Sequence, residues 1–135
     1  MTKSHLNQLT FKIIGAAIEV HKSLGPGLLE QVYAVCMEHE LKKRGMRVLK
    51  QQVIPVIYKD TLLDANLRYD LLVNDCIVVE LKAVEALHPV FEAQVMTYMT
   101  LLKVPKGILI NFFCTNIFKE GQKTFVNEYF KALPD

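Results

Sequence analysis

The segment that most constrains the fold of this chain is RYDLLVNDCIVVELK, residues 68–82, in which two apolar runs flank a short polar break. Runs rich in Val, Ile and Leu that are separated by Asn-Asp are typical of two antiparallel strands joined by a tight turn. Both runs are apolar almost throughout, which favours strands in the interior of a sheet. The segment therefore predicts a buried hairpin.

Besides Arg68 at its start and Asp75 in the turn, this hairpin carries Asp70 in the first run and Glu80 and Lys82 in the second. Side chains alternate along a strand, so Glu80 and Lys82 share one face of the sheet. An acid in so apolar a setting needs a partner, because a buried charge without one is costly. Asp70, Glu80 and Lys82 are the first candidates for chemistry in the chain.

The length of the turn decides whether Asp70 joins Glu80. A two-residue turn at Asn74–Asp75 would direct the two side chains to opposite faces of the sheet. A third turn residue, Cys76, or a bulge would place Asp70 directly opposite Glu80. We favour the second register, because it also pairs apolar neighbours on the face of the acids.

Two interpretations of the charged cluster stay open at this point. Facing carboxylates repel each other, and burial raises the pKa of at least one unless a cation compensates. A divalent metal would remove that cost, and oxygen ligands suit Mg²⁺ or Mn²⁺. The alternative is a solvated sheet face that carries a salt-bridge cluster of Lys, Glu, Arg and Asp.

The remaining periodicities predict the order of elements. Apolar spacing favours helices over residues 5–22 and 28–44, separated by the loop LGPG, and a third helix over 88–103 that is largely covered by protein. We expect strands within 46–58, a turn with a short return strand in 58–64, a strand over 107–113 buried on both faces, and a last strand or helix within 123–130. This order predicts an α/β fold with a mixed sheet flanked by helices.

Composition narrows the class of protein. A chain of 135 residues fits one domain, 1–135, and 51% hydrophobic with 22% charged residues excludes a disordered chain. A net charge of +2 lacks the strong basic excess of an electrostatic nucleic-acid binder. Three widely spaced cysteines suit a reducing compartment, and the first ten residues hold no apolar stretch of a signal peptide. We therefore expect a cytoplasmic protein with no membrane partner.

The charged hairpin resembles the PD-(D/E)XK nuclease superfamily, whose elements here are Asp70 and the Glu80–Lys82 segment, with RYD in place of the PD sequence. Gly27, Glu30 and Tyr33 fit the pattern that names the GxxExxY protein family within it. Further on, Gln94 and Tyr98 resemble the QxxxY motif of RecB-type nucleases. The likeness runs from about Ile13 to Phe112, and it implies a restriction-endonuclease-like fold.

The resemblance also implies a role for each residue. Glu30, Asp70, Glu80 and the Leu81 carbonyl would bind Mg²⁺ or Mn²⁺, and Lys82 would position water or stabilise charge on the phosphate. Gln94, Tyr98 and Tyr33 would orient Lys82 or the nucleic-acid backbone. Each has a plain structural alternative: an acid in the first turn of a helix is favourable through the dipole, and tyrosines are common core residues.

The function implied is metal-dependent hydrolysis of phosphodiester bonds, an endonuclease activity on DNA rather than RNA. A homodimer is compatible with the small size of the domain, since one copy covers little of a duplex. The alternative is a catalytically silent module that keeps the nuclease fold and binds nucleic acid or a protein partner. The modest charge favours this alternative slightly.

Overall fold

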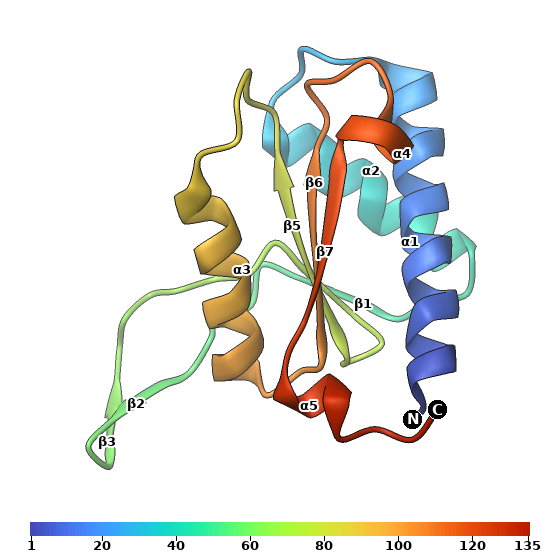
Figure 1. Cartoon of the computed structure of the whole chain (residues 1–135). Coiled ribbons are helices and arrows are strands. Elements are labelled where there is room, and N and C mark those ends of the chain that lie inside the picture. The colour runs from blue at the N-terminus through green and yellow to red at the C-terminus, as the bar shows by residue number, and fades with distance from the viewer.

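A computed structural model describes all residues from 1 to 135 and consists of a mixed five-stranded sheet flanked by helices (Figure 1). The order in the sheet is β1-β4-β5-β6-β7, with bounds Val48–Lys50, Leu71–Val73, Ile77–Lys82, Lys106–Asn111 and Gln122–Val126. Only β5 and β6 are parallel, and the other neighbours are antiparallel. The helices are α1 Lys3–Leu24, α2 Glu30–Lys43, α3 Pro89–Leu102, α4 Ile117–Glu120 and α5 Glu128–Lys131.

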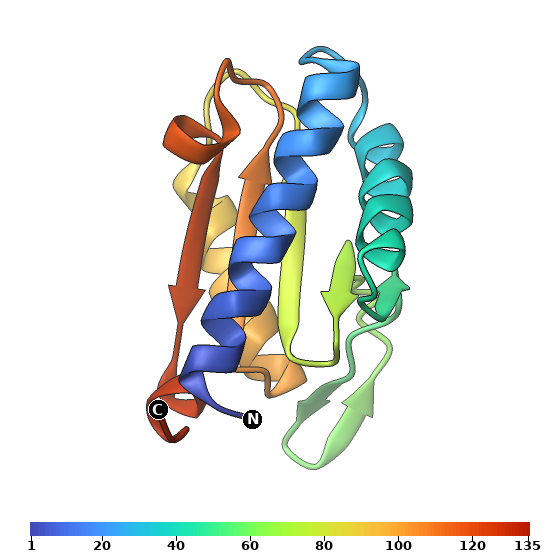
Figure 2. The same cartoon turned by 90° about the vertical axis from the view of Figure 1, so that its right-hand side faces the viewer.

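The two faces of the sheet are covered by different helices. Figure 2 shows α1 and α2 side by side over one face, with α3 behind the other. The first face holds the larger core, in which the alternate residues Ile77, Val79 and Leu81 of β5 lie in one cluster with apolar residues of α1 and α2. Val78 contacts the smaller core under α3, as the period of two along a strand requires. Glu80 follows the parity of Val78, so its side chain belongs to the α3 face.

The predicted order of elements is confirmed, with differences at the ends. The strand expected over 107–113 is β6, and all six of its residues are buried. The last segment contains both a strand, β7, and the short helix α5. The second helix begins at Glu30 because Gly25 and Gly27 both adopt positive φ, which ends the first helix and delays the next.

The third helix differs from the expectation. It is not largely covered by protein, because only Val95, Tyr98 and Met99 of α3 are buried, while Val90 and Met96 are exposed. The sheet covers one side of α3 and no second layer lies on the other. The prediction of a covered helix was wrong because apolar residues occur around its whole circumference although only one side is buried.

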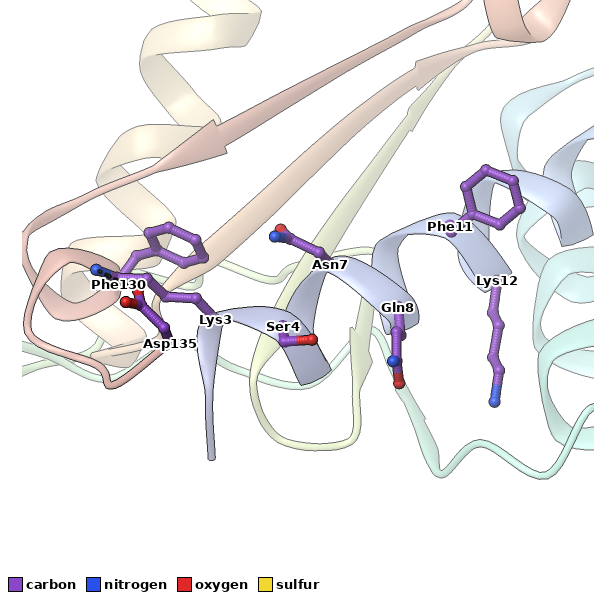
Figure 3. A pocket seen from close by; sticks show the side chains of 8 residues that line it. All are labelled: Lys3, Ser4, Asn7, Gln8, Phe11, Lys12, Phe130 and Asp135. Carbon is purple, nitrogen blue, oxygen red and sulfur yellow. Dashed lines mark ion pairs between the residues drawn. The ribbon is translucent and has the colours of Figure 1, made fainter.

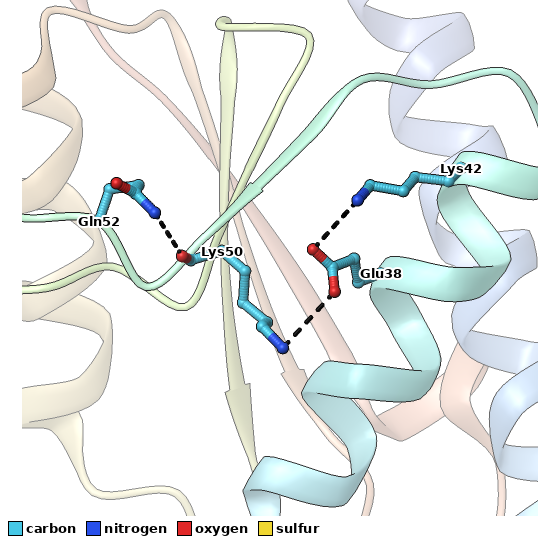
Figure 4. Close-up of polar contacts among 4 residues, drawn as sticks. All are labelled: Glu38, Lys42, Lys50 and Gln52. Atoms are coloured by element: carbon cyan, nitrogen blue, oxygen red, sulfur yellow. Dashed lines mark hydrogen bonds and ion pairs between the residues drawn. The ribbon is translucent and has the colours of Figure 1, made fainter.

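Polar contacts fasten the end of β1 to α2 (Figure 4). The Glu38 carboxylate on α2 accepts from Lys42 Nζ at 3.3 Å and lies 3.5 Å from Lys50 Nζ at the end of β1. Gln52 Nε2 donates to the Lys50 carbonyl at 2.9 Å. These contacts hold the end of β1 against α2, and the next residue, Gln51, lines a cavity with residues of the first half of α2.

The second hairpin, β2 (Val56–Tyr58) with β3 (Thr61–Leu63), pairs with no strand of the main sheet and projects from the body (Figure 1). It confirms the turn and short return strand that were predicted within residues 58–64. Pro55 stands just before β2, in agreement with its preference for edges of sheets. Helices long and apolar enough to cross a bilayer do not occur in the chain.

Candidate active site

Asp70 and Glu80 lie opposite each other. The turn between β4 and β5 contains Asn74, Asp75 and Cys76, and the register pairs Leu72 with Val78. This is the register favoured from the sequence, and the two-residue turn is excluded. Positive φ at Asn74 and Asp75 allows the tight reversal, since Asn and Asp tolerate this conformation better than most residues.

Two reciprocal hydrogen bonds join the acids to the backbone. The Asp70 N–H donates to Glu80 Oε2 at 2.7 Å, and the Leu81 N–H donates to Asp70 Oδ2 at 2.8 Å. The other oxygen of each carboxylate has no protein partner. Since no fully buried side-chain oxygen or nitrogen lacks a partner, these two oxygens reach solvent. Each acid is thus fixed through one oxygen and free to bind through the other.

The pair is electrostatically strained. Glu80 is only 4% exposed, and burial raises its pKa to about 8, with the negative charge of Asp70 adding to the effect. Burial also raises the pKa of Asp70. The Lys82 charge and the backbone N–H donors work in the opposite direction for both acids. Two neighbouring acids with raised pKa values form a site that is stabilised by binding either a proton or a metal cation.

Glu30 reaches the same region from α2. A small cavity of about 180 Å³ is lined by Glu30, Gln31, Ala34, Gln51 and Asp70. The negative charge of Glu30 is among the causes that raise the pKa of Asp70 and of Glu80. Glu30 itself is exposed. A neighbouring hollow of about 320 Å³ shares Glu30 and Gln31 and extends toward Ala83.

Lys82 lies two residues beyond Glu80 and is half-buried. Its Nζ is 4.4 Å from the centre of the Phe91 ring at the start of α3. No carboxylate lies within ion-pair distance of this ammonium, although its charge lowers the pKa of both acids. A cation held over an aromatic ring keeps its charge and stays available to an anion.

Gln94 and Tyr98 lie one turn apart on the inner side of α3. Burial raises the pKa of the Tyr98 hydroxyl, and the charges of Glu80 and Asp70 raise it further. Gln94 stands beside this hydroxyl and works in the opposite direction. The structure therefore brings the expected QxxxY residues to the α3 side of the acids.

Tyr33 lies elsewhere. It is fully buried, its ring stacks on Phe112 at 4.2 Å between centroids, and its hydroxyl donates to the Gly25 carbonyl at 2.5 Å and accepts from the Leu28 N–H at 3.3 Å. The two hydrogen bonds hold the loop before α2, and the ring packs against the end of β6. That Tyr33 orients substrate stays a prediction; in the structure its hydroxyl fixes the loop that leads into α2 and Glu30.

Three residues near the site were not anticipated. Phe91 holds Lys82, and Gln51 lines the cavity beside Asp70. Asn111 in β6 is buried and clamps Val84, accepting from its N–H at 3.1 Å and donating to its carbonyl at 2.9 Å. The clamp fixes the chain just after Lys82. The only sequence feature that could have predicted this contact is the single polar side chain, Asn111, within the apolar run GILINFF.

No group of three or more His, Cys, Asp or Glu side chains is arranged to hold a metal ion. Asp70 and Glu80 form a pair, and the exposed Glu30 does not complete a ready-made triad. A hollow of about 780 Å³ lies along the outward face of α1 beside Phe130 and Asp135, and includes none of the site residues (Figure 3).

The mixed sheet with helices on both faces and the acids at the β4–β5 hairpin define an α/β domain of restriction-endonuclease-like type. Comparison with protein families agrees: the family model of the PD-(D/E)XK nuclease superfamily matches residues 7–125, and the chain belongs to this superfamily. Neither a curated protein nor a solved structure gave a significant match.

Proposed function

We propose that this protein is a nuclease of the GxxExxY type that hydrolyses phosphodiester bonds in DNA, rather than RNA, with Mg²⁺ or Mn²⁺. The observation that carries the proposal is the pair of facing acids, the half-buried Asp70 and the buried Glu80, each fixed by a backbone N–H through one oxygen. Holding two like charges together is unfavourable without a counter-charge. Strongly perturbed acids of this kind occur more often in functional sites than as contributors to stability.

The donor set fits a hard divalent cation. Glu30, Asp70 and Glu80 would provide carboxylate oxygens and Leu81 its carbonyl, which are the ligands that Mg²⁺ and Mn²⁺ prefer. When bound, such an ion supplies Lewis-acid polarisation of the phosphate and lowers the pKa of water. Because burial raises the pKa of Glu80 to about 8, the empty pair retains a proton near neutral pH that the cation would displace.

Lys82 would act on the phosphate. Its ammonium carries no ion pair and is held over Phe91, so a positive charge stands close to the acids without being neutralised by them. At this place it would orient a water molecule or stabilise the negative charge that develops on the phosphate oxygens during attack. Gln94 and Tyr98 would steady Lys82 or contact the nucleic-acid backbone from α3.

A second candidate function is a nucleic-acid or protein-binding module without catalysis. One observation favours it: the third acid, Glu30, is exposed and no triad of ligands is formed. The two candidates differ in a measurable way, since a silent module need not bind a divalent cation at Asp70 and Glu80. We also expect a cytoplasmic location, which the three free cysteines support.

The test is a cleavage assay with the purified full chain. Single-stranded and duplex DNA and RNA are incubated with Mg²⁺, with Mn²⁺ or with EDTA, alongside the Asp70→Asn protein. We expect cleavage of DNA that needs the metal and disappears in the variant. Metal binding without cleavage of any substrate would favour the silent module, and cleavage that survives Asp70→Asn would exclude this site.

A further inference from the structure

The hollow along the outward face of α1, about 780 Å³ in volume, is lined by cationic and polar side chains at regular spacing. Lys3, Asn7 and Phe11 are four residues apart, so they form one row along the helix. Asn7 and Phe11 point to the same side in Figure 3, and Phe130 of α5 lies beside Lys3. A parallel row consists of Ser4, Gln8 and Lys12. Since the first turn of α1 contains no acid, positive charge prevails along this hollow.

Lys106, the first residue of β6, lies beneath this hollow with an uncompensated charge. It is only 6% exposed, and its Nζ donates to Asn7 Oδ1 at 3.3 Å and is 5.3 Å from the centre of the Phe130 ring. No carboxylate lies within ion-pair distance of this ammonium, and burial lowers the pKa of Lys106. A buried charge without a counter-charge is unfavourable. An anion in the hollow would supply the missing counter-charge.

The contact with Lys106 also orients Asn7. Because Asn7 Oδ1 accepts from the ammonium, the NH₂ group of the same amide has no partner in the protein and is free to donate. Lys3 Nζ lies 5.9 Å from the centre of the Phe130 ring and 3.8 Å from Asp135 Oδ1, on a fully exposed side chain. An exposed ion pair of this kind contributes little, so an incoming anion can replace Asp135. An ammonium and an amide donor are thus both available at this end of the hollow.

Phe11 adds a flat aromatic surface to the same row. It is 74% exposed, although phenylalanine is among the residues most often buried. It lies eight residues after Lys3, which is about 12 Å along the helix axis. Ammonium groups that bind phosphates, combined with aromatic rings on which bases stack, are typical of surfaces that bind single-stranded nucleic acid. A single nucleotide does not reach from Lys3 to Phe11, whereas a short strand does.

We propose that this hollow binds a single nucleic-acid strand, with Lys3 and Asn7 on a phosphate group and Phe11 stacked on a base farther along the strand. Lys106 is a positioning residue in this arrangement: it orients Asn7, and its charge attracts the phosphate from below. A charge in a setting of low dielectric constant acts more strongly than one in water. The hollow includes none of the acids of the candidate active site, so this binding needs neither metal nor cleavage.

The experiment measures binding of fluorescein-labelled oligothymidylate to the full chain by fluorescence anisotropy, in EDTA. We expect a dissociation constant of about 1–100 µM. Asn7→Asp should weaken binding at least about 10-fold, because its carboxylate pairs with Lys106 and repels phosphate. Phe11→Leu should weaken it about 10-fold by removing the stacking ring. Lys106→Met should weaken binding about 3- to 10-fold and also raise the urea midpoint of unfolding, because it removes a buried unpaired charge. Lys119→Gln on α4, which removes an exposed positive charge elsewhere, is the matched control.

Further probes identify the ligand. Oligouridylate of the same length distinguishes an RNA from a DNA strand, and binding of either supports the proposal. A wild-type chain that does not bind at about 100 µM would overturn it. So would a duplex or thymidine monophosphate that binds as tightly as the strand, variants at Asn7 and Phe11 that bind like the wild type, or equal weakening by Lys119→Gln. Because the assay contains no free metal ion, its failure would leave the proposed nuclease function intact, and loss of cleavage in Asp70→Asn would leave this proposal intact.

Discussion

The backbone N–H of Asp70 donates to the Glu80 carboxylate at 2.7 Å, so the main chain of Asp70 fixes the side chain of Glu80. The reciprocal bond runs from the Leu81 N–H to Asp70 at 2.8 Å. Asp70 immediately precedes β4, so these two bonds extend the β4–β5 ladder by one position through side-chain oxygens. They also fix two negative groups where burial disfavours their charge.

Glu80→Gln should stabilise the metal-free protein at pH 8 and not below pH 4. The folded pKa of Glu80 is about 8 against a usual 4.5, so between these values the folded state holds a proton that the unfolded chain releases. Wild-type stability therefore falls as pH rises through this window. Glutamine carries no charge but can still accept from Asp70. We expect a gain of about 1–3 kcal/mol in urea unfolding at pH 8, and an equal gain at both pH values would contradict it.

Mn²⁺ should raise the free energy of unfolding of the wild-type protein, by about 2.7 kcal/mol when its concentration is 100 times the dissociation constant. Glu80→Gln and Asp70→Asn should lose this stabilisation, because each removes a negative oxygen from the pair. The matched control is Glu128→Gln, an exposed acid on α5. Thermal unfolding with and without Mn²⁺ measures the effect. Equal stabilisation of all four proteins would place the ion elsewhere.

Lys82→Ala should separate binding from chemistry. We expect cleavage to fall by about 100-fold or more, as on removal of a group that stabilises developing charge. The stabilisation by Mn²⁺ should persist, because Lys82 provides no ligand oxygen. Lys43→Ala, at the exposed end of α2 and without an ion pair, serves as the control in both assays. Undiminished cleavage by Lys82→Ala would remove Lys82 from the mechanism.

Tyr33→Phe should loosen the loop before α2. The change removes the hydrogen bonds to Gly25 and Leu28 but leaves the ring stacked on Phe112. We expect a loss of about 1–2 kcal/mol and faster hydrogen exchange in residues 24–29. Tyr129→Phe on α5 should show neither effect. If exchange in the loop does not change, Tyr33 does not hold it.

Two glycine substitutions should act in opposite directions. A Cβ on Gly107 in β6 would lie 2.6 Å from Val95 Cγ1 and 2.7 Å from Met99 Sδ, so Gly107→Ala should cost about 1–3 kcal/mol by overpacking beneath α3. A Cβ on Gly15 in α1 meets only the flexible Arg44 side chain at 3.3 Å. Gly15→Ala should therefore be neutral or stabilising by up to about 1 kcal/mol. Chemical unfolding of both variants measures this contrast, and similar effects would contradict the close packing of α3 on β6.

The sequence by itself determined most of the fold and the nature of the site. Apolar periodicity specified the three long helices and the buried strand β6, because burial imposes a period that the residues must follow. The acids of the hairpin and the preference for a register with Leu72 opposite Val78 were also readable, since a slip by one residue would move every apolar side chain to the other face.

Only the tertiary structure decided which side chains of different elements meet. Phe91 under Lys82, Asn111 around Val84, and Tyr33 turned inward toward Gly25 depend on how α2 and α3 lie against the sheet. Periodicity reports which side of an element is apolar, and not which element covers it or how completely. For that reason α3 was expected to be covered and is half exposed, and the ribbon β2–β3 was expected as strands but not as an uncovered apolar surface.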